Sequence, residues 1–219
     1  MTTRQIYSQE LETLRHQLLA MGQQVEEAIQ SSVDALCQQD AELAQKVIDG
    51  DDAIDELEVN IEDKCMLLIA KQQPIAHDLR VIGTCLKITT DLERMGDHAT
   101  DIAEIALRLG KQPLIKPLVD IPVMAGLAKQ MLHNSLMAYL NLDIALAEQI
   151  SLDDDKVDHI YNRMFRELLT YMMEDPTTIS QATQLLFVAR YLERVADHAT
   201  NVAEWVIYLA TGQRPHKTN

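Results

Sequence analysis

An internal repeat constrains the fold of this chain more than any other feature of its sequence. The stretch DLERMGDHATDIAE at 91–104 returns as YLERVADHATNVAE at 191–204, in the same register. Upstream, a set of small, apolar and acidic residues recurs at a separation of 103: Ser32, Ala35, Asp40, Leu43, Ala44, Asp51, Asp52 and Asp55 return as Ser135, Ala138, Asp143, Leu146, Ala147, Asp154, Asp155 and Asp158. A match of this length indicates two copies of one structural unit in tandem.

Apolar residues recur at intervals of three and four, as in Leu14, Leu18, Met21 and Val25, which is typical of amphipathic helices. The 219 residues include only 7 glycines and 6 prolines, too few for a β-protein with many turns. The pattern predicts six helices, at 4–38, 40–72, 75–110, 120–142, 143–174 and 177–211.

Breaker residues mark the predicted helix boundaries. Asp40 and Asp143 are expected to cap the second helix of each unit, and Pro74 and Pro176 to open the third. The proline-rich segment 110–122 is the predicted linker. The expected fold is all-α: two tandem, homologous three-helix bundles with up-and-down, spectrin-like helices, at 1–112 and 118–219.

Acidic residues gather on one side of the third helix of each unit. At 100° per residue, a narrow stripe opposite the apolar face contains Glu93, Asp97, Asp101 and Glu104, and its second copy contains Glu193, Asp197, Asn201 and Glu204. The second helix of the first unit carries a similar stripe, with Asp51, Asp55, Glu58 and Glu62. In the second unit only Asp154 and Asp158 persist, because Tyr161 and Phe165 take the later positions.

Such stripes are unfavourable without a ligand, because like charges four residues apart destabilise a helix. Clusters of carboxylates without cysteine select hard cations such as Fe³⁺, Mn²⁺ or Mg²⁺, and Zn²⁺ also accepts them. We therefore expect a surface metal site in each unit; the alternative is a solvated acidic face on a plain helical scaffold. His98 and His198 directly follow the central aspartates. They are either metal ligands, or donors of hydrogen bonds to metal-bound carboxylates, or ordinary histidines at the boundary between core and surface.

Several classes of function are disfavoured. The net charge of −15 disfavours binding to nucleic acid or anionic lipid. No P-loop, GxGxxG or GxSxG motif is present, so we expect no catalytic residues and no enzyme activity. A ferritin-like di-iron protein, the enzymatic or storage alternative, needs Glu-x-x-His, but Gly96 and Ala196 stand at the histidine positions. The three cysteines form no CxxC pair and are expected to be buried thiols. Without a leader or a long apolar stretch, the chain is expected to be cytoplasmic.

The repeated E-x-x-x-D-x-x-x-[ND] motif resembles that of the PhoU family of phosphate-transport regulators. The resemblance covers nearly the whole chain. Its most specific segments are PIAHDLR at 74–80, LERMGD at 92–97, RELLTYMMEDP at 166–176 and LERVAD at 192–197.

The resemblance implies an α-helical adaptor, often a homodimer, that binds multinuclear metal clusters, with iron the favoured ion and zinc, manganese or magnesium as alternatives. The ligands it implies are Glu93, Asp97, Asp101, Glu193, Asp197 and Asn201, with Asp55 and Asp158 added by position. The implied partners are the ATPase of a phosphate ABC transporter and a sensor histidine kinase, so contact with the membrane is expected only through partners. The implied role is negative regulation of phosphate uptake and of the starvation response; an adaptor of a different transporter is the alternative within the family.

Overall fold

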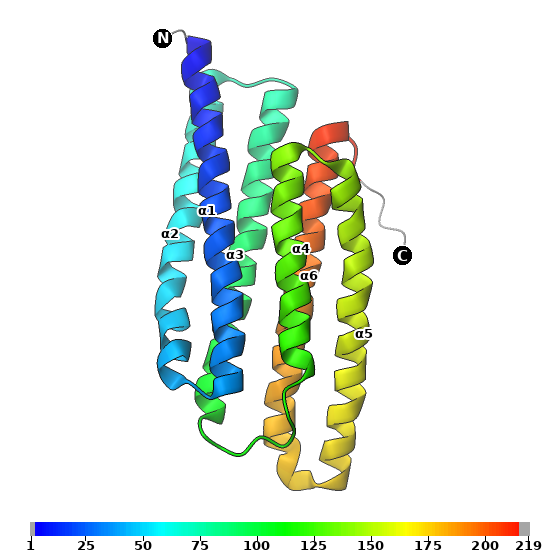
Figure 1. The fold of residues 1–219 in the computed structure, drawn as a ribbon. Helices are drawn as coiled ribbons and strands as arrows, with labels where there is room; N and C mark the ends of the chain where they lie inside the picture. Colours follow the sequence, from blue (N-terminus) through cyan, green and yellow to red (C-terminus); the bar gives the residue numbers. More distant parts are fainter. Residues whose placement is uncertain (1–2, 215–219) are drawn as a thin grey trace.

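The computed structural model describes residues 3–214, which form six long helices and one short 3₁₀ turn (Figure 1). The elements in order are α1 (Thr3–Gln38), α2 (Ala41–Gln72), α3 (His77–Leu109), α4 (Asp120–Asn141), α5 (Ile144–Glu174), η1 (Pro176–Thr178) and α6 (Ile179–Thr211). No β-strand occurs in this part of the chain. The predicted all-α fold with six helices is confirmed, and the ends differ by no more than two residues.

Side-chain caps explain where the second helix of each unit begins. Asp40 Oδ1 accepts hydrogen bonds from the backbone N–H groups of Glu42 and Leu43, both at 3.0 Å. Asp143 Oδ1 accepts one from the N–H of Leu146, also at 3.0 Å. These three bonds satisfy donors that have no partner inside the helix, so the predicted caps are confirmed.

The predicted role of the two prolines is wrong, because neither opens a long helix. After Pro74, the positive φ of 46° at Ala76 interrupts the backbone, and α3 begins only at the next residue. Pro176 starts the 3₁₀ turn η1, in which Asp175 Oδ1 accepts from the N–H of Thr177 at 2.9 Å. This separate turn delays the start of α6 to Ile179.

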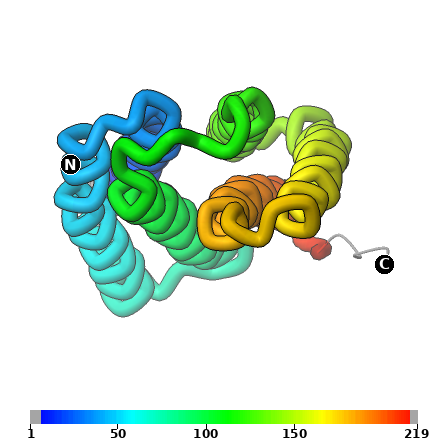
Figure 2. The backbone as a smooth tube through the Cα atoms, turned by 90° about the horizontal axis from the view of Figure 1, so that it is seen from below, coloured from blue at the N-terminus to red at the C-terminus, as the bar shows by residue number. Residues whose placement is uncertain are grey.

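The two units lie side by side as up-and-down bundles, and α3 and α6 occupy the centre between them (Figures 1 and 2). These two helices run in opposite directions. A second contact between the units joins α1 and α4, where Lys129 Nζ donates to Gln30 Oε1 at 2.7 Å. Here a Cβ on Gly22 would stand 2.2 Å from Leu136 Cδ1, so a glycine permits the close approach of the two helices.

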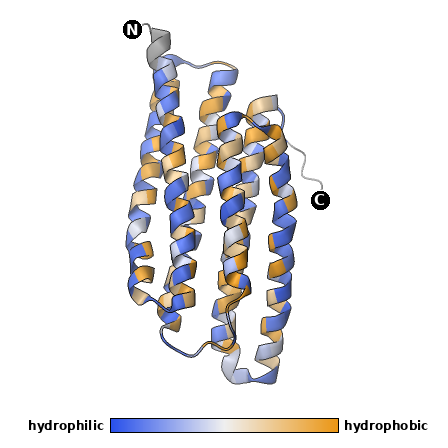
Figure 3. Cartoon of the chain, in the orientation of Figure 1, coloured by the Kyte–Doolittle hydropathy of each residue, from blue (hydrophilic) through white to orange (hydrophobic). Residues whose placement is uncertain are grey.

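Apolar side chains fill the space between the helices, and polar side chains cover the outside (Figure 3). On α3, Leu92, Met95 and Ala99 are fully buried, as predicted for the face opposite the acidic residues. Cys65 and Cys85 are buried free thiols, and Cys37 is a half-buried one. No helix within residues 3–214 has an apolar stretch long enough to cross a membrane.

Side chains from both units hold the linker that joins them. Gln39 Nε2 donates to the carbonyls of Gly110 and Gln112, at 2.9 and 2.7 Å. From the other unit, Gln181 Nε2 donates to the carbonyl of Pro113 at 3.1 Å, and Gln181 Oε1 accepts from the N–H of Ile115 at 2.5 Å. The linker is shorter than predicted, because α4 begins at Asp120 and includes the last proline of the segment.

Candidate metal centre

In the first unit, α2 and α3 bring their acidic residues together. Burial, and then the charges of Asp97, Glu58 and Asp55 in that order, together raise the pKa of Glu93 to about 7. The pKa of Asp97 is raised by burial and by Asp55. Carboxylates from the two helices therefore share one electrostatic environment, as the two helical stripes predicted.

The same acidic face continues along both helices. Burial and the charges of Asp55 and Asp97 raise the pKa of Asp51, although a hydrogen bond with Thr100 acts in the opposite direction. Asp101 has a raised pKa through burial and the charges of Glu104, Asp97 and Asp51. We define the first acid stripe as the α2 and α3 carboxylates linked in this way: Asp51, Asp55, Glu58, Glu93, Asp97 and Asp101.

Arg94 is the cation that the sequence analysis overlooked at this site. Its charge lowers the pKa values of Glu58, Glu93 and Asp97, against the larger effects of burial and neighbouring acids. Arg94 directly follows Glu93 on the helix, about 100° from it and only about 20° from Asp101 on the wheel, so its position could have identified it. Arg108 also lowers the pKa of Asp101, but two arginines beside six carboxylates still leave a large excess of negative charge.

In the second unit, α5 and α6 form a smaller version of this arrangement. Burial and the charge of Asp197 raise the pKa of Glu193 to about 7, and the same two causes raise that of Asp154 to about 6. Asp158 also has a raised pKa, through burial and Asp197. We define the second acid stripe as Asp154, Asp158, Glu193 and Asp197. Asp154 is not among the ligands that the resemblance implies, but its repeat partner Asp51 identifies it.

Glu193 differs from its counterpart Glu93 because it has a cationic partner. Arg190 Nη1 forms an ion pair with Glu193 Oε1, while Glu193 Oε2 is buried without a hydrogen-bond partner. Threonine stands at the corresponding position of the first unit, so Glu93 lacks such a pair. The arginine reduces the net negative charge of the second acid stripe.

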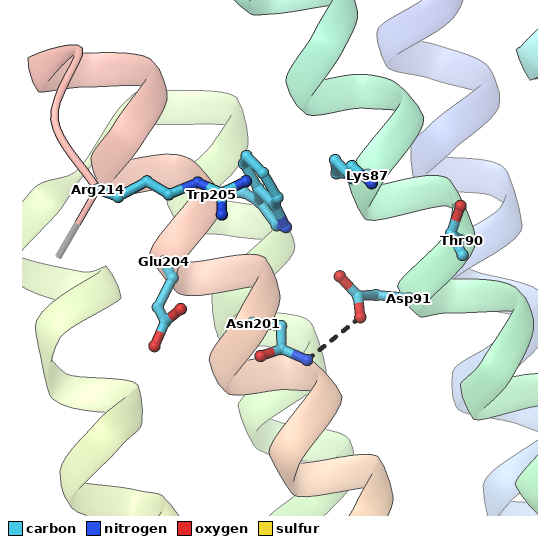
Figure 4. Close-up of a pocket in the computed structure, with 7 residues that line it drawn as sticks. All are labelled: Lys87, Thr90, Asp91, Asn201, Glu204, Trp205 and Arg214. Carbon is cyan, nitrogen blue, oxygen red and sulfur yellow. Dashed lines mark hydrogen bonds between the residues drawn. The ribbon is translucent and has the colours of Figure 1, made fainter. Parts of the chain in front are cut away.

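Asn201 lies apart from the acids that sequence analysis grouped with it. Its side chain extends toward α3, where Nδ2 donates to Asp91 Oδ1 at 3.4 Å (Figure 4). With its amide nitrogen engaged across the unit boundary, only its carbonyl oxygen remains suited to a cation. Asp101, its counterpart on α3, lies instead near Asp97 and Asp51, whose charges raise its pKa.

The two motif histidines meet between the units, with ring centroids 5.8 Å apart. His198 Nδ1 lies 2.8 Å from Asp91 Oδ1, whereas His98 stacks on Tyr191 at 5.5 Å and its Nδ1 lies 3.6 Å from Asp101 Oδ2. Burial and then the charges of His198 and nearby arginines lower the pKa of His98 to about 4. Both rings belong to the contact between α3 and α6, which a single-helix wheel does not reveal.

The donor set suits hard cations, because it consists of carboxylate oxygens with no cysteine among them. Along residues 3–214, however, no three His, Cys, Asp or Glu side chains already surround a common point at which an ion could bind. The carboxylates lie close enough to raise one another's pKa values, yet they spread along the helices. Coordination of one ion would therefore require some of these side chains to rotate.

Comparisons with known proteins place this architecture in a family. The PhoU domain profile matches residues 18–106 and 121–206. A Clostridium acetobutylicum protein named "Phosphate-specific transport system accessory protein PhoU homolog" is 45% identical over 213 residues, covering 97% of each chain. An Aquifex aeolicus protein of the same name is 48% identical over 204 residues, covering 93% of this chain and 92% of its own.

A solved structure extends the similarity to the arrangement of the helices. The crystal structure of PhoU from Pseudomonas aeruginosa superimposes with a TM-score of 0.91 at 40% sequence identity, covering 94% of this chain and 100% of that chain. The profile matches once in each of the two bundles, in agreement with the internal repeat. The chain therefore belongs to the PhoU family.

Proposed function

We propose that this chain is a metal-binding adaptor that negatively regulates phosphate uptake and the phosphate-starvation response. In this role it couples a phosphate ABC transporter, through its ATPase, to a sensor histidine kinase at the cytoplasmic side of the membrane, and it acts as a homodimer. The observation that carries the proposal is identity of 45% and 48% over more than nine-tenths of the chain to two proteins named as phosphate-transport accessory proteins.

An adaptor of this kind works through binding alone. It shifts a partner between two states by binding one of them more tightly. A firm internal structure helps such an adaptor, because strain applied to one unit is then transmitted to the other. Hydrogen bonds from Gln39 and Gln181 to the linker, together with the contacts of α3 with α6, support this property.

Metal ions would bind at the two acid stripes and neutralise them. In the first unit Glu93, Asp97, Asp101 and Asp55 would hold the ion, and in the second Glu193, Asp197 and Asp158, with Asn201 contributing only through its carbonyl oxygen. The support is that, after burial, the charges of neighbouring acids raise the pKa values of Glu93 and Glu193, so these glutamates are repelled by the carboxylates around them. Iron is the favoured ion, and carboxylate chemistry also admits zinc, manganese and magnesium.

Affinity capture tests the adaptor role. The tagged chain, expressed at its natural level in its own host, is recovered from cells grown in high and in low phosphate, and bound proteins are identified by mass spectrometry. We expect a phosphate-transporter ATPase and a sensor kinase, in amounts that depend on phosphate supply. Recovery of neither protein would contradict the proposal, and recovery of another transporter's ATPase would assign the adaptor to that system.

Elemental analysis of the untagged protein tests the metal sites. The matched variant is Glu93→Ala with Asp97→Ala, and the control is Glu10→Ala with Glu12→Ala, which removes two charges far from either stripe on α1. We expect the first variant to lose bound metal and the control to retain it. Equal metal content in all three proteins would rule out metal binding at the first acid stripe.

A further inference from the structure

A cavity of about 920 Å³ lies along α6, where it meets α3 on one side and α5 on the other. Its basic lining comes from both units and consists of Arg94, His98, Arg190, Arg194 and His198. Five carboxylates, among them Asp97 and Asp197, line its remaining wall. The cavity therefore places three arginines and two histidines beside carboxylates of both acid stripes.

The internal repeat relates the basic residues in pairs. Arg94 and Arg194 are repeat counterparts one hundred positions apart, as are His98 and His198. Because α3 and α6 run in opposite directions (Figure 1), the two histidines meet across the contact between the units, and each arginine lies about one turn from the histidine of its own helix, at opposite ends of this contact. The result is a locally two-fold arrangement of two guanidinium groups and two imidazoles.

These arginines are available for a ligand. Both are exposed, and within residues 3–214 neither forms a hydrogen bond or an ion pair with another side chain. The third arginine, Arg190, is engaged by Glu193. Two exposed guanidinium groups without partners, on either side of one contact, present fork-shaped donors of the kind that bind tetrahedral oxyanions.

Polar atoms inside the cavity also lack partners. His98 is only 8% exposed, and neither its Nδ1 nor the buried Oγ1 of Thr200 has a hydrogen-bond partner. His98 Nδ1 lies 3.6 Å from Asp101 Oδ2, beyond hydrogen-bond distance. Buried polar atoms normally find partners, so these atoms indicate a site for a ligand.

Charge decides when this site is attractive to an anion. Three arginines, Arg94, Arg190 and Arg194, line the cavity together with the two histidines. The five lining carboxylates oppose the positive charge of the arginines. Cations held in the acid stripes would cancel that opposition and leave the arginines and histidines to set the local potential.

We propose that the cavity between α3 and α6 binds a tetrahedral oxyanion of the phosphate class, held by Arg94, Arg194 and the two motif histidines, when cations occupy the acid stripes. The overall charge of −15 makes such a site unexpected from composition, and the local pairing of counterparts makes it feasible. This inference rests on the metal-binding part of the proposed function. It makes the chain itself responsive to the anion whose transport its relatives assist.

Calorimetry on the full chain tests the inference in two steps. Mg²⁺ is titrated first, to establish that the acid stripes are loaded, and inorganic phosphate is then titrated into the loaded protein. We expect Arg94→Gln with Arg194→Gln to bind phosphate at least about tenfold more weakly, because both bidentate donors are lost. The affinity of the lysine pair, Arg94→Lys with Arg194→Lys, for phosphate should lie between those of the wild type and the glutamine pair. Lysine keeps the positive charge but cannot donate two hydrogen bonds side by side as a guanidinium group does.

The control variant is Arg163→Gln with Arg166→Gln, which removes the same charge from exposed positions on α5 outside the cavity. It should bind phosphate as the wild type does, and an equal loss in this control would overturn the site. Mg²⁺ binding without phosphate binding would also overturn it, while leaving the proposed function intact. If Mg²⁺ fails to bind, the metal sites are wrong, and phosphate is then titrated into the metal-free chain. A failure of phosphate to bind there would overturn this inference as well.

Free phosphate and a phosphoryl group on a partner protein share this chemistry. A parallel titration with a short peptide containing one phosphoserine separates the two sources. Tighter binding of phosphate assigns the site to the free anion, and tighter binding of the peptide assigns it to a modified partner; both results support the site. Binding of the unphosphorylated peptide with equal affinity would overturn an oxyanion site.

Discussion

The two acid stripes occupy matching places in the repeat but differ in charge. The first acid stripe has six carboxylates with Arg94 and Arg108 nearby, whereas the second has four carboxylates and an arginine, Arg190, paired with Glu193. At α5 the later acidic positions are occupied by Tyr161 and Phe165, whose rings lie 6.4 Å apart. The comparison shows that the two copies share the same arrangement of helices while the charge of their acid stripes differs.

The largest expected effect concerns metal affinity. Glu93→Ala with Asp97→Ala should weaken binding in the first unit by at least about tenfold, because two oxygen ligands are removed. Glu193→Ala with Asp197→Ala should have a smaller effect on total binding, because the second acid stripe begins with less negative charge. Titration of Mn²⁺ into each variant measures both affinities, and a larger loss in the second double variant would reverse the proposed order.

The next effect is a dependence of stability on pH in the metal-free chain. Glu93 and Glu193 both have a folded pKa of about 7, above the ordinary value of 4.5, so folding favours their protonated forms. Their contribution to stability is full below pH 4.5 and is lost as pH rises through about 7. Urea unfolding of wild type and of Glu93→Gln, from pH 5 to pH 8, should show that wild type loses more stability than the variant.

The same comparison with Glu193→Gln sharpens the contrast between the units. Since the two glutamates have the same folded pKa, the two variants should flatten the pH profile to a similar extent. A profile that is unchanged in both variants would contradict the raised pKa values.

A smaller effect is expected from Arg190. Arg190→Gln releases Oε1 of Glu193 and removes a nearby cation, so the second unit should bind metal more tightly, by about threefold for an ion pair of about 0.7 kcal/mol. Mn²⁺ titration measures the change, and Arg166→Gln on α5 serves as the control for a loss of charge outside the stripe. Weaker binding in Arg190→Gln would mean that the arginine helps to organise the second site.

The smallest effect concerns the contact between the units. Asp91→Asn weakens the interaction of Asp91 with His198, and the free energy of unfolding should fall by about 1 kcal/mol. The counterpart change, Tyr191→Phe, keeps the stack on His98 and should stay within about 0.5 kcal/mol of wild type. Urea unfolding compares the two, and equal losses would show that both sides of the contact contribute alike.

Local chemistry made much of the fold predictable from sequence. Helical periodicity placed Leu92 and Met95 in the core, and Asp40 and Asp143 acted as caps because they occupy positions where helix N–H groups need acceptors. Prolines were a poorer guide, because the positive φ of Ala76 and the turn at η1 delay both helices. These delays arise from backbone geometry that a proline alone does not specify.

The candidate site was predictable only within each helix. A helical wheel groups Glu193, Asp197 and Asn201 by direction, but it does not show which neighbouring helix each side chain meets. Asn201 contacts Asp91 because α6 packs on α3 as well as on α5. The effect of Arg94 on Glu58 was missed for the same reason, since the two residues lie on different helices.

The meeting of His98 and His198 has a bearing on ancestry. A protein of one unit would place that histidine against its own copy in a symmetric two-fold dimer, the commonest form of self-association. Fusion of two such copies would turn the boundary between subunits into the interior contact seen here, with rings 5.8 Å apart. Once fused, the two sides could mutate independently, and a position that symmetry had kept identical became Asp91 in one half and Tyr191 in the other.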